Sequence, residues 1–379
     1  MRTAILSDLH LGAGAGEDVL RDPTVRRLLL EEIGDADRVV LLGDVVELRD
    51  LSLGVALAAA RPFFEDLGDA LGAREVTIVP GNHDHRLAEP LLDGLSLAGG
   101  AGLGLEQAAD PSPGPTGLID EWLGPARLRI AYPGVWLRGD VYATHGHYMD
   151  AHLTLPRAEC VAAALRMRLS GPLPDHASPA DYERVLRPLY GLAYGAAQVR
   201  PAPLSRRRGA PSEAAWEMLS GGAERRGNRR RRLAIAAARR GFPAAIWTLN
   251  KLLRSSFASD ISSAAIFSGG IEGAAEMASR LGLEGVHVIT GHTHRGGPYE
   301  GEAEWPLAGG GRLHNSGSWV FATVFHHPGR PPGPYWPGTV TWVEDSDAPR
   351  RVRLLMEHSH AEMTELTDRA AGLSRATRR

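Results

Sequence analysis

The sequence predicts an α/β fold built on a parallel β-sheet whose strands end in polar residues. Short apolar runs rich in β-branched residues lie at 3–6, 38–42 and 75–79, and a helical pattern at 55–71 separates the last two. This alternation of strand and helix indicates a parallel sheet with right-handed crossovers. In such sheets ligands bind beyond the carboxyl ends of the strands, so we expect the functional site at that edge.

Composition narrows the class of protein. At 379 residues the chain can form two average domains or one α/β domain with a large insertion. Its formal net charge of -3 argues against a partner bound through overall charge. The single cysteine, Cys160, excludes an intramolecular disulfide and a cysteine-rich zinc site. No stretch has the roughly 18 apolar residues that a spanning helix needs, and we expect a cytoplasmic protein.

Polar motifs follow the first three strands directly. Ser7–His10 closes the first strand, Gly43–Glu47 the second and Pro80–Asp84 the third. Because the carboxyl ends of parallel strands share one edge of the sheet, the side chains of these motifs should lie together. The side chains concerned are Asp8, His10, Asp44, Glu47, Asn82 and His83.

The middle of the chain changes pattern twice. Residues 98–117 are rich in Gly and Pro and predict a long loop. Two strands joined by a tight turn are expected at 128–137 and 140–144, and the second ends in His145-Gly146-His147. The periodicity then becomes helical, with helices expected at 156–169, 181–197, 212–219, 229–257 and 271–281.

A last buried strand is expected in 286–294, where a β-branched run stops at Gly291-His292-Thr293-His294. An isolated pair of histidines is more often solvated, but two imidazoles at a strand end are also a common pair of metal ligands. Further strands are expected at 312–315, 319–325, 339–343 and 351–356. We therefore expect a core formed by 1–150 and 284–357, an inserted helical cap at 151–283, and a polar tail at 358–379 that forms a surface helix or frays.

The strand ends together supply oxygen and imidazole donors. Imidazole favours first-row transition ions over Mg²⁺ or Ca²⁺, and a carboxylate can hold two ions close together. Two such ions clamp the attacking and leaving oxygens of an in-line displacement at phosphorus. The donors are Asp8, His10, Asp44, Asn82, His145, His292 and His294.

The ordered motifs Asp8-Leu-His10, Gly43-Asp44-Val-Val-Glu47, Gly81-Asn82-His83-Asp84, His145-Gly-His147 and Gly291-His292-Thr-His294 resemble those of the calcineurin-like metallophosphoesterase superfamily. The resemblance spans Asp8 to His294 and leaves the inserted helices and the tail uncovered. It implies two packed mixed β-sheets flanked by helices, a four-layer α/β/β/α sandwich, here with a large helical insertion. A non-catalytic protein that merely retains this fold has no chemical need for such a complete donor set.

The resemblance also implies a role for each residue. Asp8, His10 and His294 would hold one divalent transition ion and Asn82, His145 and His292 a second, with Asp44 bridging through one oxygen to each. Mn²⁺ is the favoured ion, and Fe or Zn are alternatives. A water or hydroxide shared by the ions would attack phosphorus. His83 would protonate the leaving oxygen, and Glu47, where many relatives have aspartate, would orient His83.

The substrate is less constrained by the motifs. Arg86 is expected to contact phosphate oxygens, and His147 and Asp150 are expected to reach substrate or to lie on the surface. We expect hydrolysis of a phosphomonoester or pyrophosphate bond of a small or lipid-linked substrate. The alternative is a phosphodiesterase or nuclease that acts on nucleic acid or a cyclic nucleotide.

The segment 225–257 leaves three interpretations open. Its basic first part and apolar second part suit an interfacial helix at the inner membrane face, which would make the protein a peripheral one. A solvated arginine face on a helix packed against the cap is slightly favoured over it. Binding of nucleic acid through phosphates is less favoured, because no aromatic residues for base stacking are interleaved. The pattern does not predict the oligomeric state.

Overall fold

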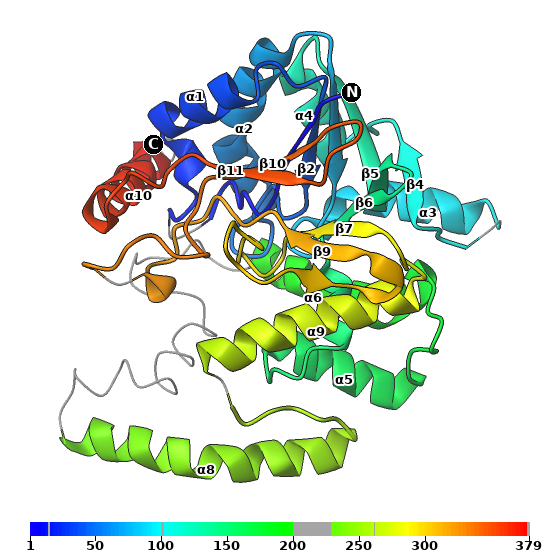
Figure 1. The fold of residues 1–379 in the computed structure, drawn as a ribbon, viewed down its shortest axis with the longest axis vertical. Coiled ribbons are helices and arrows are strands. Elements are labelled where there is room, and N and C mark those ends of the chain that lie inside the picture. The colour runs from blue at the N-terminus through cyan, green and yellow to red at the C-terminus, as the bar shows by residue number, and fades with distance from the viewer. Residues whose placement is uncertain (14–15, 100–101, 200–228, 261, 327, 377–379) are drawn as a thin grey trace.

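The computed structural model describes residues 1–13, 16–99, 102–199, 229–260, 262–326 and 328–376. They form a mixed α/β fold in which helices surround a large curled mixed sheet (Figure 1). The strands are hydrogen-bonded in the order β11-β10-β1-β2-β3-β5-β6-β7-β9-β8, and β4 pairs with β5 beside this path.

The first three strands are parallel, as predicted. They are β1 (Thr3–Leu6), β2 (Arg38–Leu42) and β3 (Glu75–Val79), and helices α1 (Pro23–Glu32) and α2 (Leu53–Leu71) connect them. Asp22 accepts a hydrogen bond from the backbone of Thr24 at the start of α1, where Pro23 occupies the first turn. These are the residue types that begin helices most readily, because they satisfy or remove a free N–H.

Strand β5 (Arg127–Arg138) joins the two halves of the sheet. Its first part pairs in parallel with β3, and its second part pairs antiparallel with β6 (Val141–Thr144). Beyond β6 lie parallel strands β7 (His287–Thr290) and β9 (Arg312–Asn315). The remaining elements on these edges are β8 (Trp305–Pro306), β10 (Thr339–Val343), β11 (Arg350–Arg353) and the C-terminal helix α10 (His360–Ala376).

Two predictions about local structure are wrong. The long loop expected at 98–117 contains β4 (Glu106–Ala109), whose half-buried residues pair with β5, and it also holds the start of α4 (Pro115–Leu123). The strand expected at 319–325 is instead a single bridge from Val320 to Asp18 followed by the short helix η6 (Thr323–Phe325). In both cases pairing with distant residues, rather than local sequence, decides the structure.

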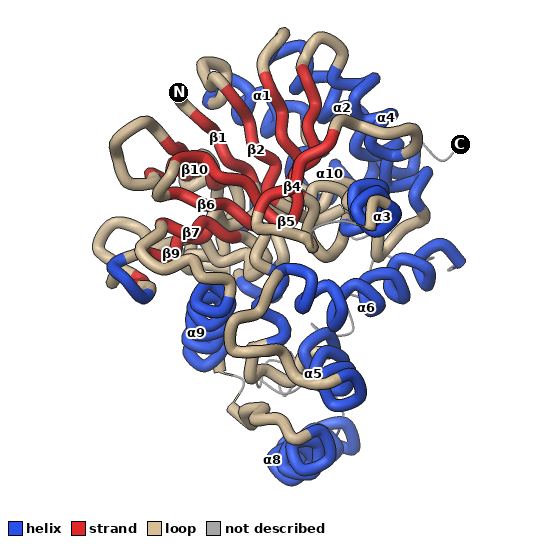
Figure 2. Tube along the Cα trace, turned by 90° about the vertical axis from the view of Figure 1, so that its right-hand side faces the viewer, coloured by secondary structure: helices blue, strands red, loops and turns tan. Residues whose placement is uncertain are grey.

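The segment between β6 and β7 is helical, as predicted. Figure 2 shows these helices below the strands, with α8 furthest from the sheet. They are α5 (Ala158–Ser170), α6 (Pro179–Val199), α8 (Arg229–Leu253) and α9 (Ser263–Arg280). The helix predicted at 212–219 and the basic residues at 225–228 lie outside the described residues. The domain boundaries remain predictions.

Three large hydrophobic clusters and a small one around Leu92 and Tyr132 fill the described part of the protein. One lies between α1, α2, α4 and the β1–β3 half of the sheet, and another lies between the inserted helices and β6, β7 and β9. The third combines side chains of both halves, among them Ile5, Val40, Ala143 and Ile289. Strand pairing runs continuously through β5, so two separate sheets are not confirmed.

Candidate metal centre

The carboxyl ends of β1, β2, β3, β6 and β7 meet at one place. The backbone N–H of His292, after β7, donates to the carboxylate of Asp8, after β1, at 2.9 Å. His145, after β6, donates from Nδ1 to the carbonyl oxygen of Leu42, the last residue of β2, at 3.1 Å. These two bonds join the two halves of the sheet at the strand ends.

Two glycines make this close approach possible. Gly43 has a φ of 79°, and a β-carbon at that position would collide with the ring of His145. A β-carbon at Gly291 would collide with the side chains of Ser7 and Asp8. Only glycine fits such contacts, so each of these motifs depends on its glycine.

The backbone of five predicted ligands lies in the left-handed region. They are five of the six non-glycine residues with positive φ in the described part of the chain. A non-glycine residue in this conformation costs roughly 1–2 kcal/mol, so it persists only where other contacts enforce it. The φ angles are 54° at Asp8, 44° at His10, 50° at Asp44, 65° at His292 and 59° at His294.

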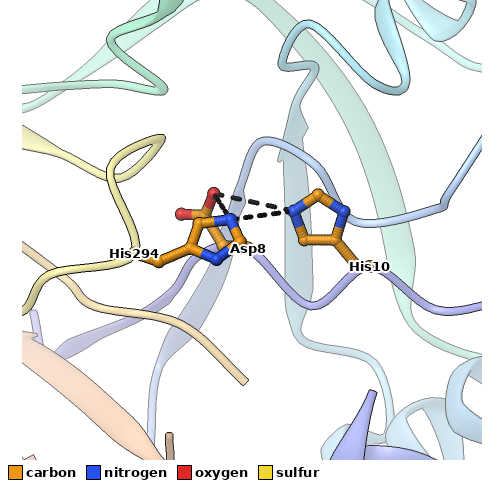
Figure 3. A group of neighbouring side chains, drawn as sticks. All are labelled: Asp8, His10 and His294. Carbon is orange, nitrogen blue, oxygen red and sulfur yellow. Dashed lines mark hydrogen bonds and ion pairs between the residues drawn. The ribbon is translucent and has the colours of Figure 1, made fainter. Parts of the chain in front are cut away.

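The first predicted ligand group is assembled as expected. Nε2 of His294 lies 3.1 Å from Nε2 of His10 and 3.3 Å from Oδ1 of Asp8. Figure 3 shows the three side chains converging from the loops that follow β1 and β7. Ligand atoms that bind one metal ion at about 2.1 Å lie roughly 3 Å apart, so the spacing suits one ion.

The second predicted group lies on the other side of Asp44. Oδ1 of Asn82 lies 3.2 Å from Nε2 of His145 and 3.1 Å from Nδ1 of His292. Oδ2 of Asp44 lies 3.3 Å from Nε2 of His145. Asp44, His145 and His292 also place one potential ligand atom each within 4.8 Å of one another.

Asp44 connects the groups through a single oxygen. Oδ2 lies 3.6 Å from Nε2 of His10 as well as 3.3 Å from Nε2 of His145. Oδ1 accepts a hydrogen bond from the backbone N–H of His83 at 2.7 Å. The expectation of one oxygen for each ion therefore does not match the geometry, which turns Oδ2 toward both groups.

Hydrogen bonds orient the ligand imidazoles. Nδ1 of His10 donates to Glu47 at 2.8 Å, and Nε2 of His292 donates to Asp150 at 2.9 Å. His145 makes a similar bond to Leu42. In each of these three imidazoles one ring nitrogen donates a hydrogen bond, and the other faces the remaining predicted ligands. Acceptors behind ligand histidines fix the tautomer and raise the basicity of the ligand nitrogen.

The site has a strongly negative electrostatic environment. Burial lowers the pKa of His145, but the carboxylates of Asp44 and Asp8 outweigh burial and raise this pKa to about 9. Likewise, Glu47 and Asp44 outweigh burial at His10 and raise its pKa to about 10. Burial would raise the pKa of Asp44, but the nearby histidines hold it well below its ordinary range. A field that favours protonated imidazole equally favours a bound cation.

The orientation of the Asn82 amide indicates whether a cation fits between the ligand groups. Its oxygen faces His145 Nε2, His292 Nδ1 and, at 3.3 Å, Asp44 Oδ2. When both histidines are neutral and make the bonds described above, these two nitrogens and the carboxylate oxygen each present a lone pair. The amide oxygen therefore faces only acceptors, and a cation placed between these atoms would satisfy all of them. Reversing the amide would instead turn its oxygen toward Nη1 of Arg49 at 2.9 Å. The inward oxygen and the donor types fit a divalent transition ion.

His83 and Glu47 lie together beside this centre. Nδ1 of His83 donates to Oε2 of Glu47 at 2.7 Å, while Nε2 lies 4.0 Å from Oδ2 of Asp44. The side chain of His83 is 26% exposed, whereas Glu47 is buried. The longer glutamate therefore reaches His83, as expected, and its bond to His10 was not anticipated.

The two predicted substrate contacts lie in different settings. Arg86 is exposed on the short helix η2 (His85–Leu87), and among the described residues no hydrogen bond or ion pair joins it to the ligand groups. His147 is buried, with Nε2 3.1 Å from the hydroxyl of Tyr132. Substrate contact by either residue stays a prediction.

Sequence reasoning missed Arg49 and Glu159, and for Asp150 it predicted substrate contact or a surface position rather than the buried bond to His292. Asp150 orients His292, and Arg49 pairs with Glu159 of α5 at 2.9 Å while reaching the amide of Asn82. Asp150 had a weak signal, since it closes the His145–Asp150 segment after a strand end. Arg49 and Glu159 gave none, because their pairing joins distant parts of the chain.

Residues 1–164 match the family model described as calcineurin-like phosphoesterase. The match supports the metallophosphoesterase superfamily over this part of the chain, which holds the motifs up to His145-Gly146-His147 but not Gly291-His292-Thr-His294. That family assignment implies metal-dependent hydrolysis of a phosphoester. No curated protein matches the chain significantly. Among the described helices, none combines the length and apolarity needed to cross a bilayer.

Proposed function

We propose that the protein hydrolyses a phosphomonoester or pyrophosphate bond of a small or lipid-linked substrate at a dinuclear metal centre. The observation that supports this proposal best is Oδ2 of Asp44, which faces His10 in one ligand group and His145 in the other. Two divalent ions held by these groups would neutralise phosphate charge and lower the pKa of a water shared between them. Mn²⁺ suits the mixed set of imidazole, carboxylate and amide ligands.

The residues of the chain supply the acid–base chemistry. With Nδ1 bound to Glu47, His83 has Nε2 free to donate a proton to the leaving oxygen. Burial would raise the pKa of Glu47, but His83 and His10 outweigh it and hold that pKa below its ordinary range. Glu47 therefore stays ionised and accepts the hydrogen bond that holds the ring of His83 in place, with Nε2 left for proton transfer.

We also propose that the protein has the four-layer α/β/β/α arrangement expected for the superfamily. Side chains of β1, β2, β6 and β7 share one hydrophobic cluster, and separate clusters lie between each half of the sheet and its own helices. This order of clusters supports an α/β/β/α arrangement in which β5 runs from one inner layer to the other.

The outer face of α8 supports a lipid-linked substrate. Trp247 and Leu252 are 59% and 72% exposed, while Ile246 and Leu253 on the other side of the helix are buried. Lys251 lies over the ring of Trp247, with 4.1 Å from Nζ to the centroid. An exposed tryptophan beside basic residues is typical of a helix that lies at an anionic membrane surface. The side chains at 229–239 are not described.

The test is an assay on p-nitrophenyl phosphate and bis(p-nitrophenyl) phosphate, each with Mn²⁺ and with a chelator. Mn²⁺-dependent release from the monoester supports the proposal. Release from the diester alone, together with salt-dependent retention of DNA, would favour the nuclease alternative. Absence of turnover on both substrates in protein that binds metal would contradict a hydrolytic function.

A further inference from the structure

Asp150 lies where the inserted helices leave the sheet. It belongs to the short helix η3 (His147–Ala151), which follows the end of β6 directly. Its Oδ1 lies 2.9 Å from Nε2 of His292, which follows the neighbouring strand β7. Both residues are buried, at 2% and 7% exposure. The first turn after β6 is therefore bonded to a ligand of the second group.

The bond determines which edge of His292 faces the other ligands. A carboxylate only accepts, so Nε2 carries the proton and Nδ1 carries the lone pair. Nδ1 lies 3.1 Å from Oδ1 of Asn82, on the side of the second ligand group. Without an acceptor at Nε2, the ring would be free to rotate or to protonate the other nitrogen, and the lone pair would no longer be held toward the site.

Asp150 has no other described hydrogen-bond partner. Its second oxygen, Oδ2, is buried and accepts no hydrogen bond from the described residues. A buried carboxylate is costly unless it is paired. Arg157, at the start of the insertion, and Arg49 interact with Asp150 electrostatically, but neither donates a hydrogen bond to it. An acid kept only to anchor the insertion would be expected to join it to the core through hydrogen bonds. Glu183 of α6 shows that arrangement, because it accepts bonds from Tyr132, Tyr148 and His85, which all precede the insertion.

We propose that Asp150 is a positioning residue that fixes the tautomer and orientation of His292 and thereby sets the affinity of the second metal position. This inference rests on the proposed function, since it assigns a role within the same centre. It also gives the turn that leads from β6 into the insertion a direct part in assembling the site.

The experiment compares Asp150→Ala, Asp150→Asn and the control Glu183→Gln. Mn²⁺ binding is titrated calorimetrically, and bound metal is counted after gel filtration. We expect Asp150→Ala to weaken one of two binding events by about 10- to 100-fold and to leave the other unchanged. Asp150→Asn keeps an acceptor without the charge, so its loss should be smaller. Glu183→Gln removes a buried acid of the insertion that touches no ligand, so both events should persist.

A second readout does not involve metal. The ¹⁵N NMR shifts of His292, assigned by comparison with His292→Gln, report which ring nitrogen carries the proton in the metal-free protein. We expect the Nε2–H tautomer in the wild type and its loss in Asp150→Ala.

The outcomes separate the two proposals. Unchanged Mn²⁺ binding in both Asp150 variants, or equal weakening in Glu183→Gln, would overturn the role of Asp150 while the proposed function stands. Failure of the wild type to bind Mn²⁺ at all would overturn the proposed function, and this inference with it.

Discussion

Glu47 accepts a hydrogen bond from Nδ1 of His10 at 2.8 Å. The same oxygen, Oε2, accepts from Nδ1 of His83 at 2.7 Å. One carboxylate oxygen therefore serves a predicted metal ligand and the predicted proton donor at once. The metal position beside His10 and the acid–base function of His83 should consequently respond together when Glu47 is changed.

Replacing Glu47 by Gln should lower both metal affinity and turnover. Glutamine keeps the length of the side chain but removes the charge that both imidazoles share. We expect about 10- to 100-fold weaker binding at one metal position, measured by Mn²⁺ titration, and lower kcat at saturating Mn²⁺. Asp50→Asn is the matched control, because this exposed acid of the same loop bonds to neither histidine in the described structure. Metal binding at wild-type strength in Glu47→Gln would contradict the shared role.

Replacing His83 by Asn should lower turnover alone. Loss of an acid–base group typically reduces the rate by roughly 10²- to 10⁴-fold. His83 belongs to neither predicted ligand set, although it forms with His10 and Asp44 a further group that could hold an ion. Because both predicted sets stay intact in the variant, bound metal should remain at the wild-type level in elemental analysis. If metal is lost with activity, His83 is a ligand and not the proton donor.

Replacing Asp44 by Asn should reduce occupancy of both metal positions. The change removes the negative charge of Asp44, whose Oδ2 faces both ligand groups, while an amide oxygen can still accept the bond from the backbone of His83. Elemental analysis after gel filtration should show metal falling well below the wild-type content, with turnover falling in parallel. Near-normal metal and turnover would refute the bridging assignment.

The buried pair of His85 and Glu183 should make stability fall at alkaline pH. Burial lowers the pKa of His85, but Glu183 and Glu89 outweigh it and raise this pKa from 6.5 to about 9. Folding thus favours the protonated form. The stabilisation is complete below about pH 6.5 and is lost as the pH rises through about 9, with an upper limit of about 3 kcal/mol.

Urea unfolding of the wild type and His85→Gln measures this effect. The difference in the free energy of unfolding should be largest near pH 6 and should shrink by about pH 10. The control is His176→Gln, which changes an exposed histidine of the insertion that carries Glu183. A difference that is constant across this range would show that packing, rather than charge, accounts for the contribution of His85.

Replacing Trp247 by Ser should weaken binding to anionic vesicles. Sedimentation with phosphatidylcholine vesicles, with and without phosphatidylglycerol, measures the bound fraction at two salt concentrations. We expect binding only to the anionic vesicles, weakened by salt and reduced several-fold in Trp247→Ser. Leu97→Ser is the control, because Leu97 is 89% exposed on α3 (Glu89–Leu97), outside the insertion. Equal binding by both variants and the wild type would exclude this face of α8 as the contact.

Much of the site could be predicted because its residues follow buried strands. An apolar run that stops at Gly43-Asp44 or Gly291-His292 marks both the strand and its carboxyl end, and parallel pairing then brings the ends together. Local sequence was sufficient here because the strand, the turn and the ligand lie within a few residues of one another.

The remaining features depend on contacts between distant segments. Glu47 reaches His10, and Asp150 reaches His292 across 142 positions of sequence. Neither bond has a local pattern, because each depends on how neighbouring loops pack. β4 was missed for a similar reason, since its residues lack the apolar alternation of a half-buried strand and it forms by pairing with β5.

The insertion joins the sheet at two adjacent strands. β6 and β7 pair in register from Val141 opposite His287 to Ala143 opposite Ile289, so the chain returns to the sheet beside the point where it left. A segment of almost any size can occupy that position with little added entropic cost of loop closure. An evolutionary exchange of this segment, or a laboratory chimera, could therefore change substrate selection and leave the sheet intact. A replacement would need to leave Asp150 in place on His292 and to cover the apolar face of β6, β7 and β9 that the inserted helices bury.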